Sequence, residues 1–149
     1  YFFGMPSQMK ATTDRCLPFM LPYMGNLVED KNASFHELRD ESMHEKRLVV
    51  ITTCGYVDEK PMYPALLKQL DLIAGEGHYT AILCPEGELF IADKAKRQRE
   101  GYLAEITRAG AEFAQNRALS EETKKRIAKP ILSPKGFETI TLAHWGMNK

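Results

Sequence analysis

The distribution of apolar residues along the chain predicts two buried strands with a helix between them. The segments "RLVVITTC" (Arg47–Cys54) and "YTAILCP" (Tyr79–Pro85) are continuous apolar runs rather than alternating ones. Such runs are typical of strands that are covered on both faces, as in a parallel sheet. Between them, apolar residues recur at helical spacing, namely Leu66, Leu67, Leu70 and Ile73. This strand–helix–strand order predicts a βαβ unit, whose two strands run parallel.

Helices are also predicted on both sides of this unit. Pro6 favours a helix start, and the apolar face of that helix comprises Met9, Thr13, Cys16 and Leu17. Pro18 and Pro22 end it. Residues 25–46 are polar and charged, which predicts a surface excursion with a short helix.

The last third of the chain reads as helical. A long helix from Asp93 carries a predicted buried stripe at Leu103, Ile106, Gly110 and Phe113. Ser120 is a predicted cap of the next helix, and Pro130 ends that helix. The tail predicts one more short helix, with Phe137, Ile140 and Trp145.

This element order predicts an α/β class, as the back half of a layered parallel sheet. Two strands make a poor sheet on their own, and both strands here are apolar on both sides. Tyr1, Phe2 and Phe3 resemble the end of a further strand. We therefore expect the chain to be a fragment, with the front half of the domain upstream of Tyr1.

Composition narrows the function classes. The 149 residues carry 20 basic and 20 acidic side chains, so a formal net charge of +0 offers no basis for binding nucleic acid or an anionic membrane. No apolar run approaches the roughly 20 residues that span a bilayer. The three cysteines and four histidines show no ligand spacing, so neither a metal site nor a disulfide framework is predicted. Reduced thiols favour a cytoplasmic protein.

Two short stretches at strand ends carry the candidate chemistry. "YFFGMP" and "TTCGY" each place glycine and aromatic residues directly after a strand and before a helix. In open α/β sheets, ligands bind outside the carboxyl ends of the strands. Glycine lets a backbone approach a ligand closely, while aromatic rings and threonine hydroxyls suit a planar ring with polar edges. The alternative for residues 1–3 is that they are only buried aromatics.

These residues resemble a known family. "YFFGMPSQMKATTDR" is similar to a segment of flavodoxin-like, NAD(P)H-dependent FMN reductases and of the related iron–sulfur flavoproteins. The matched positions are Tyr1, Gly4, Met5, Pro6, Gln8, Lys10, Asp14 and Arg15. "VVITTCGY", "ILCPEGEL" and "AHWGM" also fit this group, so the resemblance covers essentially the whole chain.

The resemblance implies a flavodoxin-like domain over residues 1–149, of which only strands 4 and 5 are present, with a helical extension over residues 117–149. It implies an FMN site. The residues that would border the flavin ring are Tyr1, Phe2, Phe3, Gly4, Met5, Thr52, Thr53, Cys54 and Gly55. No catalytic acid, base or nucleophile is assigned, because in such enzymes the flavin carries the chemistry. The partners implied are NAD(P)H, a small-molecule electron acceptor and a further copy of the chain, in a homodimer or larger homo-oligomer.

The expected function is an NAD(P)H-dependent FMN oxidoreductase. The phosphate-binding loop of the family would lie upstream of Tyr1, as would the cysteines that hold an iron–sulfur cluster in some relatives. We therefore expect the chain alone to be inactive and to bind FMN poorly. The alternatives are a flavodoxin-type electron carrier, without NAD(P)H turnover of its own, and a cofactor-free α/β interaction domain.

Several other residues have two interpretations. Glu86 and Glu88 follow the second strand and form either an acidic rim on the site or a solvated loop. Cys54 is either a nucleophile or a small apolar residue, and Cys16 and Cys84 are expected to be core thiols. The basic run "KAKRQR" predicts an exposed helix face. The "AHWGM" tail either caps the core or makes a subunit contact.

Overall fold

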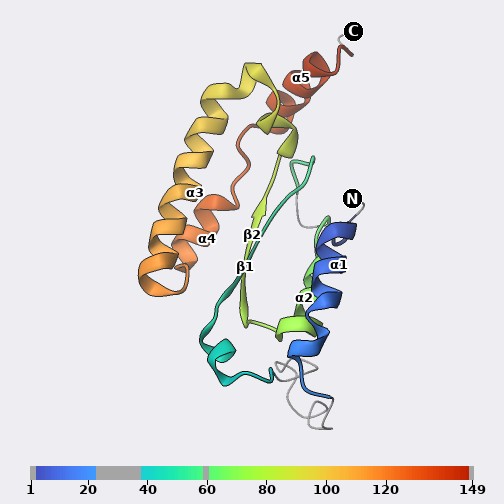
Figure 1. The fold of residues 1–149 in the computed structure, drawn as a ribbon. Helices are drawn as coiled ribbons and strands as arrows, with labels where there is room; N and C mark the ends of the chain where they lie inside the picture. The colour runs from blue at the N-terminus through green and yellow to red at the C-terminus, as the bar shows by residue number, and fades with distance from the viewer. Residues whose placement is uncertain (1–2, 23–37, 59–60, 148–149) are drawn as a thin grey trace. The chain divides into compact units, whose positions relative to one another are not determined.

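The described residues contain a pair of parallel strands (Figure 1). The structure, a computed structural model, describes residues 3–22, 38–58 and 61–147. Strands β1 (Leu48–Thr53) and β2 (Tyr79–Cys84) pair with each other in one sheet. The helix α2 (Pro64–Ala74) connects them, so the predicted strand–helix–strand unit is confirmed. The described residues also form α1 (Ser7–Arg15), α3 (Lys96–Asn116), α4 (Glu121–Ile127) and α5 (Pro134–His144).

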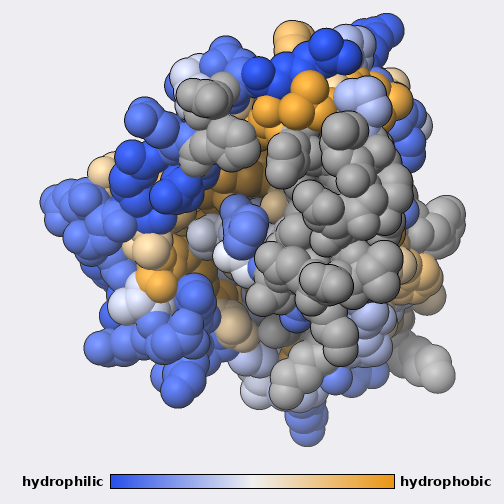
Figure 2. All heavy atoms as spheres, turned by 90° about the horizontal axis from the view of Figure 1, so that it is seen from below, coloured by the Kyte–Doolittle hydropathy of each residue, from blue (hydrophilic) through white to orange (hydrophobic). Residues whose placement is uncertain are grey.

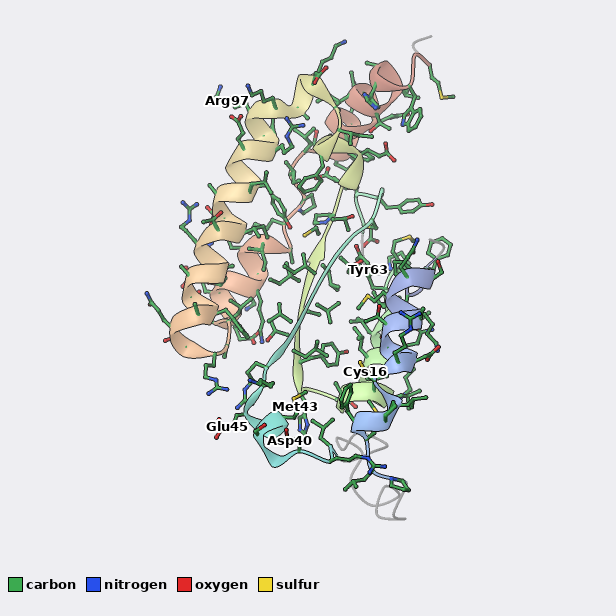
Figure 3. The ribbon with its side chains drawn as sticks, in the orientation of Figure 1. Cys16, Asp40, Met43, Glu45, Tyr63 and Arg97 are labelled. Atoms are coloured by element: carbon green, nitrogen blue, oxygen red, sulfur yellow. The ribbon has the colours of Figure 1, made fainter. Side chains whose placement is uncertain are left out.

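Short 3₁₀ helices complete the described elements. They are η1 (Leu17–Phe19), η3 (Glu41–Glu45), η4 (Gly87–Phe90) and η5 (Asp93–Ala95). The side chain of Asp40 accepts a hydrogen bond from the Ser42 amide at the start of η3 (Figure 3). The short helix predicted within residues 25–46 is thus confirmed at Glu41–Glu45, while residues 25–37 lie outside the described part of the chain.

The chain divides into two compact units. The first unit comprises Tyr1–Val49 and Lys60–Thr80, and the second comprises Val50–Glu59 and Ala81–Lys149. The first unit therefore holds α1, η1, η3 and α2, and the second holds η4, η5 and α3 to α5. Two of the three boundaries, after Val49 and after Thr80, fall within the strands.

Helix α2 follows its sequence signals closely. Pro64 occupies its first turn, where proline is favoured, and Gly75 follows its last residue with a φ of 88°. Such a backbone conformation is accessible to glycine at little cost. Leu66 and Leu70 are buried, as is Tyr63, which precedes the helix (Figure 3).

Helix α1 forms where it was predicted but does not bury its apolar face. Pro6 precedes it, and it ends at Arg15, before Pro18. None of its residues is buried, and Met9 is 39% and Leu17 is 57% exposed. The residues of the predicted face are thus exposed or half-buried in the structure. Cys16, expected in the core, is only half-buried at the end of this helix (Figure 3).

Helix α3 turns inward a face that differs in part from the predicted one. Tyr102 and Ala109 are its buried residues, whereas Leu103 is 43% exposed and Gly110 is also exposed. Ile106 and Phe113 are half-buried and continue the same stripe at helical spacing, so the predicted stripe is confirmed at these two residues and wrong at Leu103 and Gly110. The reason is tertiary, because the Tyr102 hydroxyl donates to the Ile127 carbonyl at 3.0 Å and its ring meets the edge of Phe90. Arg97 points outward from α3, as expected for the basic run (Figure 3).

A hydrophobic core cluster of the second unit is formed by residues of η4, of η5 and of the segment between them. Leu89, Ala92 and Ala95 are buried, and the partly buried residues packed against them are Ile131, Leu132, Phe137 and Ile140. Ser120 caps α4 by accepting from the Thr123 amide at 3.2 Å, as predicted. Ser133 caps α5 in the same way through the Gly136 amide. Trp145 lies just beyond the last turn of α5 rather than within it.

Candidate functional site

The loops that follow the two strands are joined directly by backbone hydrogen bonds. The Gly87 amide donates to the Cys54 carbonyl at 2.6 Å, and the Glu86 amide donates to the Tyr56 carbonyl at 2.9 Å. The Cys54 amide donates to the Cys84 carbonyl at 3.1 Å, which extends the strand pairing by one step. All of these residues belong to the second unit. The carboxyl end of the strand pair is therefore a single hydrogen-bonded structure.

Gly87 is required where the two loops meet. A Cβ atom at this position would lie 2.9 Å from the Cys54 carbonyl oxygen, which is closer than carbon and oxygen normally approach. Glu86, directly before it, has a φ of 55°, a left-handed conformation that is uncommon outside glycine, asparagine and aspartate. The tight turn after β2 thus depends on one small residue and one unusual backbone conformation.

Glu86 is fully buried, with 0% of its surface exposed. Its carboxylate accepts from the amide of Ile131 and, at 3.1 Å, from the amide of Leu132. Burial raises the pKa of Glu86, and the two backbone amides oppose that rise. Both interpretations of Glu86 from the sequence were wrong, because it is neither a solvated loop residue nor part of an open acidic rim. It connects the turn after β2 to the linker between α4 and α5.

The last residues of β1 and the loop that follows them offer an accessible surface with mixed chemistry. Thr53 and Gly55 are exposed, Thr52 and Cys54 are half-buried, and Tyr56 is 52% exposed. The glycine backbone, the hydroxyls and the aromatic ring therefore lie within five consecutive residues at one strand end. This is the combination that a planar ring with polar edges requires, so Thr52–Gly55 remain the candidate contacts.

The cysteines near this loop differ in environment. Cys84 is buried, and burial raises the pKa of its thiol, which disfavours the nucleophilic thiolate. This fits the expected core role. The Cys54 thiol is half-buried and donates weakly to the Tyr56 carbonyl at 3.6 Å. This local contact is consistent with a small residue that supports the loop.

The other predicted contacts belong to the first unit. Tyr1 and Phe2 lie outside the described residues, and Phe3 is 47% exposed with a φ of 54°. Gly4 and Met5 are half-buried, and the Met5 sulfur accepts from the Thr13 hydroxyl at 3.6 Å. The structure therefore groups Phe3–Met5 in one unit and Thr52–Gly55 in the other.

The first unit contains a pocket that sequence reasoning missed. Its volume is about 260 Å³, and it is lined mainly by apolar side chains from α1, η1 and α2. The lining residues are Met5, Lys10, Thr13, Asp14, Leu17, Met20, Gln69, Leu72 and Ile73. Lys10 and Asp14 form an ion pair there. Thr13 and Leu17, which belong to the apolar face predicted for the first helix, are part of this lining. That apolar face was the one feature of the sequence that could have indicated the pocket.

A second missed feature lies next to the loop after β1. The indole nitrogen of Trp145 donates to Glu88 Oε2 at 3.1 Å. Glu88 Oε1 lies 3.4 Å from the position that a Cβ of Gly55 would occupy. Glu88 is therefore between the end of α5 and the candidate loop. No local pattern could indicate this, because 57 positions separate Glu88 from Trp145.

Comparisons of the chain with protein-family models, with curated proteins and with solved structures found no match. The family resemblance seen in the sequence therefore stays a prediction. Within residues 3–22, 38–58 and 61–147, no helix has the length and apolar character to cross a membrane. The same residues contain no cluster of three or more histidine, cysteine or acidic side chains suited to a metal ion.

Proposed function

We propose that this chain is part of a flavodoxin-like, NAD(P)H-dependent FMN oxidoreductase and contributes residues that border the flavin ring. One observation carries the proposal. The loops after two neighbouring parallel strands are hydrogen-bonded to each other, through Gly87 and Cys54, at the carboxyl end of the sheet. This is the edge at which open α/β sheets bind ligands.

The residues on this edge fit a flavin ring. Gly55 is exposed and carries no side chain, which favours a close approach of a flat ring on the side of the backbone that Glu88 does not cover. Thr53 supplies a hydroxyl, and the exposed ring of Tyr56 supplies a flat apolar surface. FMN, when bound, would accept hydride from NAD(P)H and pass electrons to a small acceptor. The role of the chain would be to bind and orient the ring through Thr52–Gly55. The contacts that the resemblance implies for Tyr1, Phe2 and Phe3–Met5, in the other unit, are a separate prediction.

The turn after β2 would keep this surface in shape. Because Gly87 and Glu86 both donate to carbonyls of the β1 loop, that loop cannot move without breaking two hydrogen bonds. Glu86 is itself held from the opposite side by Ile131 and Leu132. A site held in advance loses less free energy on binding than a flexible one.

A flavin titration on the chain itself tests the binding surface. We expect riboflavin and FMN to bind weakly and with similar affinity, because the contacts proposed here are to the ring. Backbone amide shifts measured by NMR should change at Thr52–Gly55, and shifts at Phe3–Met5 test the separate prediction for those residues. The variant Gly55→Ala should weaken binding, because its methyl group would occupy the approach to the loop, while Gly101→Ala, on α3, should not. Unchanged shifts at these loops up to millimolar riboflavin would contradict the proposal.

A second experiment separates the oxidoreductase from the electron carrier. The complete reading frame that encodes this chain is expressed, and the absorption of the purified protein is recorded before and after NADH or NADPH is added. Loss of flavin absorption on mixing supports the oxidoreductase. A flavin spectrum that neither nucleotide bleaches supports the electron carrier. Purification without any flavin rejects both and leaves an interaction domain.

A further inference from the structure

The indole of Trp145 is held through its nitrogen while most of the residue is exposed. Its nitrogen donates to Glu88 Oε2 at 3.1 Å, and the residue is nevertheless 59% exposed. The ring of His144 stands nearly perpendicular to it, with ring centroids 5.5 Å apart. A large, oriented aromatic face at the surface is a common element of recognition sites.

The position of this indole is set by the core of the second unit. Leu89, next to Glu88, is completely buried, and Phe137 and Ile140 of α5 pack against its cluster. The same packing that joins η4 to α5 therefore brings Trp145 to Glu88. The hydrogen bond is a consequence of core geometry rather than a chance contact between two mobile side chains.

Glu88 adds a negative charge between the indole and the candidate loop. One carboxylate oxygen receives the indole hydrogen bond, and the other faces the backbone of Gly55. A Cβ at Gly55 would lie 3.4 Å from this oxygen, so the carboxylate lies close to the loop backbone. A ring lying on the indole would thus meet a π face on one side and a carboxylate at its edge.

We propose that Trp145 and Glu88 form a binding site for a planar aromatic ring that carries a positive charge. Such a ring is attracted both to an indole face and to a carboxylate, whereas an anionic ring of the same shape is repelled. The site lies beside Gly55, on the loop proposed to border the flavin. Binding itself needs no flavin, and only the use of the site in electron transfer rests on the proposed function.

Oxidised nicotinamide and small cationic aromatic electron acceptors share this chemistry. A comparison of 1-methylnicotinamide with NAD⁺ separates the two sources. If the natural ligand is a dinucleotide, NAD⁺ should bind more tightly than the isolated ring. If the ligand is a small cation, the phosphates of NAD⁺ should make it bind more weakly. Either order of affinities supports the site. If neither molecule binds, the proposal is overturned.

Trp145 is the single tryptophan of the chain, so its fluorescence reports on the site directly. We titrate the 149-residue chain with 1-methylnicotinamide and, separately, with nicotinate, which has a similar ring and a negative charge. Fluorescence lifetimes distinguish a bound complex from collisional quenching. The expected result is saturable quenching by the cation with unchanged lifetime, and affinity for nicotinate lower by about fivefold or more.

The variant Glu88→Gln removes the charge but keeps an oxygen that can accept from the indole. It should lower the affinity for 1-methylnicotinamide by about fivefold and abolish the preference over nicotinate. Glu138→Gln removes an exposed carboxylate from α5 and serves as the matched control, which should bind as the unmodified chain does. A urea unfolding curve of each variant shows whether it is folded before binding is measured.

Three results would overturn the site. The first is equal quenching by the cation and the anion, and the second is quenching that is purely collisional. The third is an emission maximum that shifts to shorter wavelength as protein concentration rises, which would show that a second copy covers Trp145. Flavin titration is independent of all three, so the site and the proposed function can fail separately.

Discussion

The two units of the chain differ in how their helices are buried. In the second unit, α4 buries Thr123 and Ile127, and α5 packs onto the buried cluster around Leu89. Among the described residues of the first unit, only Tyr63, Leu66 and Leu70 are buried hydrophobic residues. Helix α1 buries none, and Phe19 just after it is 62% exposed. Figure 2 shows hydrophobic side chains reaching the surface among hydrophilic ones.

This difference shows that helix formation and helix burial are separate events. Both α1 and α5 are amphipathic segments of similar length, and both form where the sequence predicts them. Neither helix has a fully buried residue, but Phe137 and Ile140 of α5 are partly buried against the Leu89 cluster. Most of the stability that point mutations can remove should therefore reside in the second unit, because large losses come from buried groups.

The largest expected effect is that of Glu86→Ala. The change leaves the amides of Ile131 and Leu132 without their carboxylate, in a place where Glu86 itself is fully buried. We expect the free energy of unfolding to fall by about 2–4 kcal/mol. Urea denaturation measures it. Glu86→Gln is the control and should retain most of the stability, because its amide oxygen can still accept. A loss below about 0.5 kcal/mol for Glu86→Ala would contradict the conclusion that buried groups of the second unit carry most of the stability.

The same residue predicts a dependence on pH. Since burial raises the pKa of Glu86 above its ordinary value of 4.5, the folded protein holds this proton more tightly than the unfolded chain does. The stabilisation that comes from this tighter proton binding is thus fully present below pH 4.5, and it is lost as the pH rises through the pKa of Glu86 in the folded protein. The stability of the unmodified chain minus that of Glu86→Gln should fall across this window. Urea curves at several pH values test it, and a rising difference would contradict the prediction.

Gly87→Ala should have the next largest effect. Its methyl carbon would lie 2.9 Å from the Cys54 carbonyl oxygen, so the backbone of the two loops must shift. The expected loss is about 1–3 kcal/mol in thermal or urea denaturation. Gly110→Ala is the matched control, because a Cβ there meets no atom within 4 Å. It should stabilise the chain by about 0.5–1 kcal/mol, since alanine is the better helix former. Equal effects of the two changes would contradict the close approach of Gly87 to the Cys54 carbonyl oxygen.

A smaller effect is expected for Tyr79→Phe in the first unit. The Tyr79 hydroxyl donates to Asp71 at 2.8 Å, and burial together with this carboxylate raises the pKa of Tyr79. Removal of the hydroxyl should cost about 0.5–1.5 kcal/mol. A loss larger than that of Glu86→Ala would reverse the ranking of the two units.

The smallest expected effect is that of Phe19→Ser. Phe19 is largely exposed, so its removal should change the free energy of unfolding by less than about 0.5 kcal/mol. The matched substitution in the second unit is Phe137→Ser, which removes a ring packed against the Leu89 cluster and should cost considerably more. A similar loss for both would show that the ring of Phe19 is covered in solution.

The parts of the fold that depend on neighbouring residues could be predicted from the sequence. Both strands, helix α2 between them and the caps of α4 and α5 follow from apolar runs, proline, glycine and serine at specific positions. The candidate loop Thr52–Gly55 was also predictable, because a ligand edge in a parallel sheet follows from strand order alone. These features share one cause, which is that their determinants lie within a few residues of each other.

The packing of the elements was decided only by the tertiary structure. The inward face of α3 includes Tyr102 in place of the predicted Leu103, because the Tyr102 hydroxyl donates to the Ile127 carbonyl 25 positions away. The burial of Glu86 depends on amides 45 and 46 positions further along, and the contact of Trp145 with Glu88 depends on a core that joins η4 to α5. The sequence by itself thus determined where strands and helices form, since short-range sterics and hydrogen bonding control that. The environment of each side chain was determined by contacts between distant segments, which no local pattern encodes.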